Sequence, residues 1–414
     1  MAPINRLLGR RIMMLVMIVA ATAVLAAACG DDDDKQTLKI GFLADFSGPL
    51  AEFGPGIQTG VELAILHINE AGGVLGNDVE FVTGDTQVDA TQGIEEARRL
   101  VEVEGVHAIV GPLASSVTLA VSESVTADAG IPVISPSATS SALSSAPDNG
   151  YLFRSTISDA AQGVVLAKLA SDEGFDNVAV LFLNDAYGQG LAETFENAFT
   201  GTVTKASFED GAASYLAELQ SAAGGGAEVL VAIGFPTQAE IFIREALEND
   251  IFSKFLFVDG TKSMDLIEAI GAENLEGFKG TAPGAGPDSP SLLAWNAAYE
   301  AKYGALPTGP FAREAYDATI AIALAAQYAG STDGAAIRDA LATIGSPGGT
   351  IYIPGADSIK DAVKAVKDKK DINFEGSATT LDWDANGDVT SGFVGIWQYA
   401  GGAIVEIEEI PFSQ

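Results

Sequence analysis

Two stretches rich in serine and threonine each follow an apolar segment of the chain. They are GPLASSVT at 111–118 and SPSATSSAL at 135–143. Free backbone N–H groups at a helix start, with hydroxyl groups beside them, form a neutral cradle for an anion. A carboxylate suits such a cradle, so these loops are the first candidates for a binding site. Some of these serines can instead simply cap helices, and Ser116 and Ser140 are the clearest cases for that alternative.

One acidic residue lies in an apolar segment, where burying its charge costs free energy. Asp259 ends the apolar segment FLFV, and a carboxylate in such surroundings is costly unless it has a partner. We therefore interpret it as a candidate partner for a cationic group. The alternative is an N-cap for a helix that begins after Lys262.

Residue patterns for catalysis or cofactor binding are scarce. The chain has no G-x-S-x-G, G-x-x-x-x-G-K-[ST] or H-E-x-x-H motif. Its two histidines, His67 and His107, fall in a helix and a strand, where we expect structural roles. GPGIQTG at 54–60 has the wrong glycine spacing for a dinucleotide loop. DWDANGD at 382–388 starts like a calcium loop, but Phe393 stands where a bidentate glutamate is required, so a β-turn is preferred. We predict no enzyme activity, no cofactor and no metal.

Strands and helices alternate along the chain, and they must position these loops. Apolar segments that do not alternate with polar residues, each followed by a helix, predict parallel sheets covered on both faces. Two such sets are found, with strands predicted at 38–43, 79–85, 106–111 and 131–135, then at 177–183, 202–208, 228–234 and 254–260. Further helices are predicted at about 290–303, 311–329, 333–344 and 358–370, before antiparallel strands with turns at 386–387 and 401–402.

The predicted fold class is therefore α/β, with two doubly wound parallel-sheet lobes joined by a three-strand hinge. About 385 residues follow a predicted leader, more than one core usually serves. We predict that the chain leaves the first lobe, builds the second and returns, so each lobe has two segments. Lobe 1 is assigned to 38–154 and 281–376, and lobe 2 to 155–280 and 377–414.

The amino terminus predicts export. A basic start, an apolar run and small residues before Cys29 form a signal peptide at 1–28. The pattern resembles a bacterial lipoprotein, in which Cys29 carries the lipid and 29–37 is an acidic tether. Leu25 lies four residues before Cys29, one more than usual, and ordinary cleavage after Ala28 would instead release a soluble protein. The apolar run is also compatible with a permanent anchor helix, and DDDDK with a cleavage tag left by cloning.

The charge of the chain excludes one class of partner. Without residues 1–28, 19 basic residues remain against 56 acidic ones, a net charge of −37. Such a surface repels phosphate backbones, so nucleic acid is not expected as a partner. No cysteine follows Cys29, so neither lobe relies on a disulfide bond.

Several motifs in order give the chain a family resemblance. They are IGFLADFSGPLAEFG, GVELAILHINEAGGVLG, GPLASS, VISPSAT, FRSTISDAAQG, LNDAYGQG and LDWDANGD. Together they resemble the branched-chain amino acid-binding (Leu/Ile/Val-binding) family of type I solute-binding proteins that serve ABC importers. The resemblance covers nearly everything from residue 38 onward.

The resemblance implies a set of ligand-binding residues. Ser115, Ser137, Ala138 and Thr139 match the positions that hold a ligand's α-carboxylate and α-ammonium. Asp259 matches the acid that pairs with the ammonium, and the aromatic positions correspond to Phe53, Tyr187 and Phe235. Members often carry tyrosine in place of Phe53 and Phe235, and glutamate in place of Asp259, so we expect a more apolar pocket here.

The expected function is that of a monomeric, membrane-anchored binding protein. It would trap a branched-chain or other hydrophobic amino acid between the lobes by hinge closure and deliver it to an ABC permease. Amides, urea and aromatic acids are alternative ligands, because relatives take them. A ligand-sensing module for a signalling partner is the alternative from another class, and an exported hydrolase is a third.

Overall fold

The computed structural model describes residues 37–413. The predicted signal peptide, Cys29 and the tether up to residue 36 lie outside the described residues. Within the described part, strands form a five-stranded sheet, a seven-stranded sheet and a pair. No helix of this part combines the length and the apolar character that crossing a bilayer requires.

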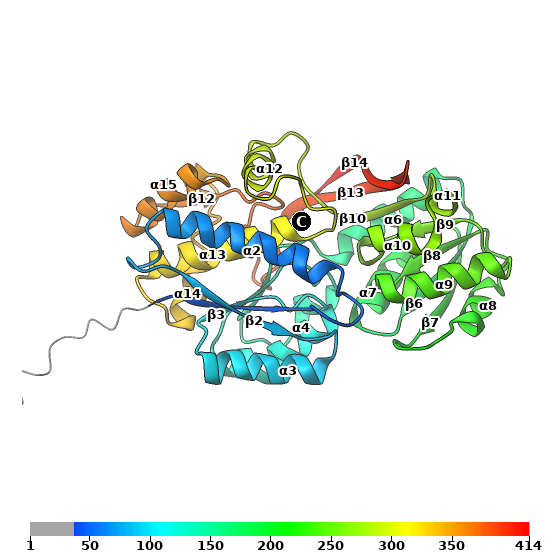
Figure 1. Ribbon diagram of the computed structural model, residues 1–414, viewed down its shortest axis with the longest axis horizontal. Helices are drawn as coiled ribbons and strands as arrows, with labels where there is room; N and C mark the ends of the chain where they lie inside the picture. Colours follow the sequence, from blue (N-terminus) through cyan, green and yellow to red (C-terminus); the bar gives the residue numbers. More distant parts are fainter. Residues whose placement is uncertain (1–36, 414) are drawn as a thin grey trace, which may run out of the picture. The chain divides into compact units, whose positions relative to one another are not determined.

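The first sheet is wholly parallel and has the order β2-β1-β3-β4-β5. Its strands are β1 (Lys39–Ala44), β2 (Glu80–Asp85), β3 (Ala108–Val110), β4 (Val133–Ser135) and β5 (Leu152–Arg154). Helices cover both faces, with α2 and α13 on one and α3 and α4 on the other (Figure 1). The helices of this lobe are α2 (Phe53–Glu70), α3 (Ala90–Arg98), α4 (Ser115–Val121), α5 (Ala127–Ala129), α13 (Ala312–Ala329), α14 (Gly334–Leu341) and α15 (Ala356–Lys367).

The second sheet has the order β14-β13-β10-β9-β8-β6-β7, and its last two strands in the chain run antiparallel. Its strands are β6 (Asn177–Leu183), β7 (Thr202–Phe208), β8 (Val229–Ile233), β9 (Phe255–Phe257), β10 (Lys279–Gly284), β13 (Ser391–Ala400) and β14 (Ala403–Ser413). The helices that flank it are α6 (Asp159–Asp172), α7 (Ala186–Ala198), α8 (Leu216–Ala223), α9 (Pro236–Glu248), α10 (Met264–Ile270) and α11 (Ala272–Leu275).

The remaining elements lie where the chain returns from the second sheet to the first and then crosses to the second sheet again. After β10 the chain forms α12 (Pro290–Tyr303) and then α13, and a small parallel pair joins β11 (Thr350–Tyr352) to β12 (Ile372–Phe374). The chain passes between the sheets after β5, after β10 and after β12. The predicted crossing at residue 280 thus falls inside β10, which pairs with β9 and β13 of the second sheet.

The strand interiors explain why the sheets are covered on both faces. All five residues of β8 are buried, and so are five of the six in β1. This is the burial expected for apolar strands without alternation. Gly60 of α2 shows how closely the covering layer packs, because a Cβ there would lie 1.9 Å from the carbonyl oxygen of Ala312 in α13. GPGIQTG therefore lies within α2, where Gly60 allows the close approach of α13 and Gly54 the close approach of the backbone at Asp45.

Three elements at the crossings are not predicted from the sequence. The sequence pattern predicts only links at 151–159 and 278–287. The structure instead has a strand in each link: β5 forms an edge of the first sheet, and β10 lies between β9 and β13 in the second. Helix α6 escapes prediction because its exposed side begins with Ala160 and Val164, so its sequence lacks most of the polar stripe that marks a surface helix. Most of the other predicted helices and strands form within a few residues of the expected bounds.

Candidate functional site

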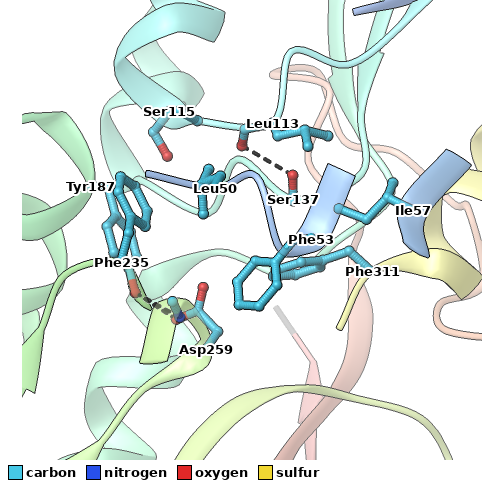
Figure 2. Close-up of a pocket in the computed structure, with 12 residues that line it drawn as sticks. Leu50, Phe53, Ile57, Leu113, Ser115, Ser137, Tyr187, Phe235, Asp259 and Phe311 are labelled. Atoms are coloured by element: carbon cyan, nitrogen blue, oxygen red, sulfur yellow. Dashed lines mark hydrogen bonds between the residues drawn. The ribbon is translucent and has the colours of Figure 1, made fainter. Parts of the chain in front are cut away.

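The carboxyl ends of the parallel strands of both sheets carry the loops that line one cavity. Ligands of open α/β sheets bind at such edges. Figure 2 shows the cavity with side chains from β3 and β4 loops on one side and from β6, β8 and β9 loops on the other. It is lined by Leu50, Phe53, Ile57, Leu113, Ala114, Ser115, Ser137, Tyr187, Phe235, Asp259, Gly260 and Phe311.

The cavity is narrow in the structure. Its volume, counted out to its opening to solvent, is about 350 Å³. Hydrogen bonds join its two walls, from the Ser116 hydroxyl to Asp185 at 3.3 Å and from the Ser140 hydroxyl to the carbonyl oxygen of Ala186 at 2.7 Å. The two walls therefore lie close together, and the cleft between the sheets is nearly closed.

Two serines on the first-lobe wall have opposite hydrogen-bonding roles. The Ser115 hydroxyl accepts a hydrogen bond from the backbone N–H of Ser140 at 3.2 Å, so its own proton is free to be donated. The Ser137 hydroxyl donates to the carbonyl oxygen of Leu113 at 3.0 Å, so it can only accept from a further group. No side chain caps the start of α4 beside Ser115. The wall thus offers both a donor and an acceptor without any charge.

The two neighbouring predicted residues lie behind this wall. Ala138 and Thr139 are fully buried and are not among the residues that line the cavity. The Thr139 hydroxyl has no hydrogen-bond partner in the described part of the chain. The structure thus brings Phe53, Ser115, Ser137, Tyr187, Phe235 and Asp259 to the cavity and keeps these two beneath its surface.

Asp259 on the opposite wall is held by polar partners. One carboxylate oxygen accepts hydrogen bonds from the Gln162 amide at 2.7 Å and from the Tyr187 hydroxyl at 2.9 Å. Asp259 does not cap the helix that follows, because Ser263 performs that role for α10 by accepting from the N–H of Leu266. The interpretation of Asp259 as an N-cap for that helix is therefore wrong. It is the one charged side chain among those that line the cavity.

The aromatic residues form the apolar part of the site. The rings of Tyr187 and Phe235 stack with their centroids 5.5 Å apart and nearly parallel. The Tyr187 hydroxyl donates to Asp259 and accepts from the N–H of Gly260 at 3.2 Å, so its hydrogen bonds are made within the protein. Tyr187 therefore positions Asp259 and offers its ring to the cavity, while Phe53 closes the other side (Figure 2).

A second acid near Asp259 is not predicted from the sequence. Asp159, the first residue of α6, is completely buried, and neither of its carboxylate oxygens has a hydrogen-bond partner in the described part of the chain. Burial raises its pKa well above the usual range, and the negative charge of Asp259 raises it further. The Thr139 hydroxyl lies close enough to lower this pKa somewhat, although its geometry is not that of a hydrogen bond. Burial likewise raises the pKa of Asp259.

Direct hydrogen bonds join the two lobes beside the cavity. The Glu52 carboxylate, just before α2, accepts from the Ser263 hydroxyl and from the N–H of Met264 at 3.0 Å, at the start of α10. On the other side, Ser116 donates to Asp185 at 3.3 Å, so the interpretation of Ser116 as a helix cap is wrong. Ser140 donates to the carbonyl of Ala186 at 2.7 Å, and it also caps a short helical turn, as expected for a capping serine.

The remaining candidate motifs are structural. His67 bonds to the Tyr316 hydroxyl at 2.8 Å, and His107 accepts from the N–H of Lys39 at 3.1 Å. DWDANGD forms the expected turn, in which the N–H of Gly387 donates to the carbonyl of Asp384. Asp388 of that motif pairs with the buried Arg154 at 2.6 Å. Within residues 37–413, no cluster of histidine, cysteine and acidic side chains suits a metal ion.

This arrangement of two α/β lobes around one cleft agrees with a family comparison. The family model described as periplasmic binding protein matches residues 37–368. The chain belongs to the periplasmic binding protein family. Members of this family work outside the cytoplasm, and the relatives described next are solute-binding proteins.

Two relatives indicate what members of this family do. A Pseudomonas aeruginosa leucine-, isoleucine-, valine-, threonine- and alanine-binding protein is 30% identical over 74% of this periplasmic binding protein and 82% of its own length. The substrate-binding protein BasB of a chemotactic signal transduction system in Halobacterium salinarum is 26% identical over 87% of this chain and 86% of its own.

Solved structures confirm the predicted fold class. The branched-chain amino acid transporter substrate-binding protein LivJ from Streptococcus pneumoniae, in complex with isoleucine, has a TM-score of 0.74 and 26% identity, covering 92% of this chain and 100% of that one. An ABC transporter solute-binding protein from R. palustris, in complex with benzoate, has a TM-score of 0.70 at 19% identity, covering 91% and 97%. The latter likeness concerns the fold alone.

Proposed function

We propose that this periplasmic binding protein carries a branched-chain or other hydrophobic amino acid to an ABC importer. The observation that supports this most is the polarity of the cavity. Neutral donors and acceptors stand on one wall, one buried acid stands on the other, and aromatic and aliphatic side chains fill the rest. An α-amino acid has a matching order of anion, cation and apolar side chain.

Each end of the ligand has a partner under this proposal. The ligand carboxylate accepts from the Ser115 hydroxyl and from backbone N–H groups at the start of α4. The ligand ammonium donates to Asp259, with Ser137 as a neutral acceptor beside it. Ala138 and Thr139 lie behind the first-lobe wall and act indirectly. They hold the loop in place, and Thr139 influences the electrostatic environment of Asp159. Phe53, Phe235 and the ring of Tyr187 contact the ligand side chain.

The lining also argues against aromatic acids, amides and urea as ligands. An aromatic acid such as benzoate brings a negative charge and no cation, and the only charged lining group is already negative. Like charges at close range in a partly desolvated site repel strongly. Amides and urea are small and polar, whereas most of the lining is apolar. A hydrophobic zwitterion fits both features.

Ligand capture by this route requires the lobes to separate and close. Lobe 1, built around the five-stranded sheet, binds the ligand first, and lobe 2, built around the seven-stranded sheet with β10, then swings over it. Closure of this kind is typical of periplasmic binding proteins. A ligand favours the closed form only through contacts that it makes there. The bonds of Glu52 to the start of α10 add a ligand-independent contribution to the same closed form.

The proposal includes an anchor and a membrane partner. Cys29 carries lipid, the tether lets the lobes reach the importer, and an ABC permease receives the ligand from the monomeric binding protein. More than one acyl chain is needed for stable anchoring. Mass spectrometry of the mature chain tests this part, because an unmodified Cys29 would contradict it.

Sensing is a second candidate function, favoured by the similarity to BasB. A sensing module has the same fold and the same site, but its closed form binds a signalling partner in place of an importer. Neighbouring permease and ATPase genes favour transport, whereas a neighbouring kinase or cyclase gene favours sensing.

A thermal-shift screen tests the ligand class. A ligand that binds only the folded protein raises its melting temperature. We expect leucine, isoleucine or valine to give the largest shift among amino acids, amides, urea and aromatic acids. A larger shift with benzoate or urea would overturn the assignment, and turnover of any of these compounds would instead favour an exported hydrolase.

A further inference from the structure

A second hollow lies on the first lobe, away from the ligand cavity. It is bordered by the loop after α2, at residues 71–76, by the last part of α13 and by α15. Its volume, counted out to its opening to solvent, is about 770 Å³, against about 350 Å³ for the ligand cavity. No residue lines both, so the hollow is separate from the site described above.

Three lysines of α15 border this hollow without an acidic partner. Lys360, Lys364 and Lys367 have the i, i+4, i+7 spacing that places side chains on one face of a helix. All three are exposed, and none forms an ion pair within residues 37–413. Asp361 is the one acid in the lining, so positive charge is in excess here. The chain as a whole is strongly acidic, which makes this local excess of positive charge exceptional.

A buried amide adds a neutral donor to the lysines. Gln327 of α13 lines the hollow and is only 6% exposed. Its amide oxygen accepts from the N–H of Leu75 at 2.8 Å, so the nitrogen is the amide atom left for the hollow. This nitrogen donates no hydrogen bond to the described part of the chain. A buried donor without a partner costs free energy, and a bound acceptor would remove that cost.

A phosphate group matches this set of donors. Three ammonium groups and one amide can all donate, and a phosphate has several oxygen atoms that accept from different directions. Lysine binds phosphate as a point charge, without the planar geometry that favours arginine for a carboxylate. The volume of the hollow also exceeds what a single carboxylate needs.

The hollow lies at the same edge of the first sheet as the start of the described chain. The loop at 71–76 leads to β2, and the N–H of Glu80 in β2 donates to the carbonyl oxygen of Leu38 at 3.0 Å. This is the amino edge of the parallel strands, whereas the ligand cavity lies at their carboxyl edge. Figure 1 shows α15 and the start of β1 at the same end of the lobe. Cys29 is eight residues before Thr37, and a chain of that length spans at most about 28 Å.

We propose that this hollow binds a phosphate group, and that on the anchored protein the phosphate belongs to an anionic phospholipid headgroup. The choice of a lipid as the source rests on the proposed anchor at Cys29, whereas phosphate binding itself does not. An anchor within about 28 Å raises the effective concentration of headgroups at the hollow. Acidic groups elsewhere on the protein do not prevent binding, because salt screens exposed charges beyond about 8 Å. Binding in this way holds the ligand cavity away from the bilayer.

The test measures how fast the three lysines of α15 are acetylated. Cys29 is the only cysteine, so a maleimide lipid in vesicles couples the chain from residue 29 at that position alone. One set of vesicles is phosphatidylcholine, whose choline neutralises the phosphate, and the other is an equal mixture with phosphatidylglycerol. Mass spectrometry compares the three lysines with the exposed Lys168 of α6. The uncoupled chain, with Cys29 capped by iodoacetamide, is measured with and without inorganic phosphate.

Matched variants separate a binding site from general attraction of charge. Gln327→Glu keeps an oxygen for the N–H of Leu75 and replaces the free donor with a repelling carboxylate. Gln220→Glu makes the same charge change at an exposed position of α8. Lys364→Gln and its control Lys254→Gln change exposed positions, so they keep the test valid if Gln327→Glu does not fold. Circular dichroism reports whether each variant is folded.

We expect acetylation of the three lysines to be at least about five-fold slower on vesicles with phosphatidylglycerol than on phosphatidylcholine, the scale of one lysine near an anionic membrane. Inorganic phosphate should slow the same lysines in the uncoupled chain. Gln327→Glu and Lys364→Gln should lose most of both effects, with the latter read at Lys360 and Lys367. Gln220→Glu and Lys254→Gln should keep them.

The contrary outcomes distinguish the parts of the proposal. No slowing in either arm, or full slowing in folded Gln327→Glu, would overturn it. Slowing by inorganic phosphate alone would refute the lipid source and leave a site for free phosphate. Equally slow lysines in every arm, released when the acids at 31–34 become asparagine, would refute it in favour of the chain's own acidic run. An unmodified Cys29 in the cell would refute only the proposed anchor, because maleimide coupling does not depend on it.

Discussion

The two walls of the cleft differ in how they handle charge. The first-lobe wall contributes hydroxyl and N–H groups and no charged side chain, whereas the second-lobe wall contributes Asp259, with Asp159 buried behind it. A neutral wall can bind a carboxylate with dipoles alone. A wall with two acids in low dielectric carries a cost until a cation arrives. Under the proposed function, the ammonium group of the ligand offsets this cost on the second-lobe wall, and the first-lobe wall needs no charge.

The acidic wall should carry the largest single effect. Asp259→Asn removes the charge that pairs with the ligand ammonium and keeps the shape. We expect amino acid binding to weaken by about 1.5 to 3 kcal/mol, the scale of a hydrogen bond to a charged group. Isothermal titration calorimetry measures this change, and the exposed Asp250→Asn is the control. Equal affinities of the wild-type protein and Asp259→Asn would show that the ammonium does not bind there.

The same wall predicts opposite pH trends with and without ligand. Burial raises the pKa of both Asp159 and Asp259. An acid whose folded-state pKa is raised stabilises the fold below its unfolded pKa of about 4, and this contribution is lost as the pH rises through the folded pKa. An ammonium ligand instead binds the ionised carboxylate, so its affinity should rise with pH over the same range. The expected rise is about ten-fold for each unit by which ligand binding lowers the pKa of the carboxyl group.

Melting curves with and without ligand between pH 4 and 8 test these trends. We expect the ligand-free protein to melt at a lower temperature as the pH rises, and the ligand-induced shift to grow. Burial also raises the pKa of Asp317 and Glu409 to about 7, so part of the ligand-free trend belongs to them. Asp159→Asn should make the ligand-induced melting shift depend less on pH. It should leave the contribution of Asp317 and Glu409 to the ligand-free trend unchanged. A ligand-induced shift that shrinks with rising pH would refute the cationic partner.

The neutral wall should show a smaller and position-specific effect. Ser115→Ala removes a hydroxyl whose proton is free for the ligand, and we expect a loss of about 1 kcal/mol in binding. The neighbouring Ser116→Ala removes only the 3.3 Å bond to Asp185, so its effect on binding should be smaller. Titration of both variants with the same amino acid compares the two. A larger loss for Ser116→Ala would mean that the serines have been assigned the wrong way round.

The contact between the walls should have the smallest effect. Glu52→Gln weakens the bonds to the start of α10 without touching the ligand cavity. We expect binding to weaken by about 0.5 to 1 kcal/mol, through loss of a charge at a helix N-terminus. Glu70→Gln, at the exposed end of α2, is the control. Small-angle X-ray scattering should show more open protein in Glu52→Gln, and an unchanged distribution would count against this contact as a support of closure.

The sequence predicts the two walls unequally well. The serine loops and Asp259 can be found, because hydroxyl groups after parallel strands and an acid after an apolar strand are unusual. Asp159 escapes prediction, because an acid in the first turn of a helix is ordinary and nothing local reveals its burial. Phe311 and Leu50 escape it for a related reason, since only the tertiary fold brings these apolar loop residues to the cavity.

The direct test of the central claim is a titration with three molecules that share one side chain. Leucine has both charges, isocaproate lacks the amino group, and isoamylamine lacks the carboxylate. We predict that leucine binds at least ten-fold more tightly than either analogue, and that Asp259→Asn narrows the gap between leucine and isocaproate. Isocaproate binding as tightly as leucine to the wild-type protein would contradict a cleft built for one anion and one cation.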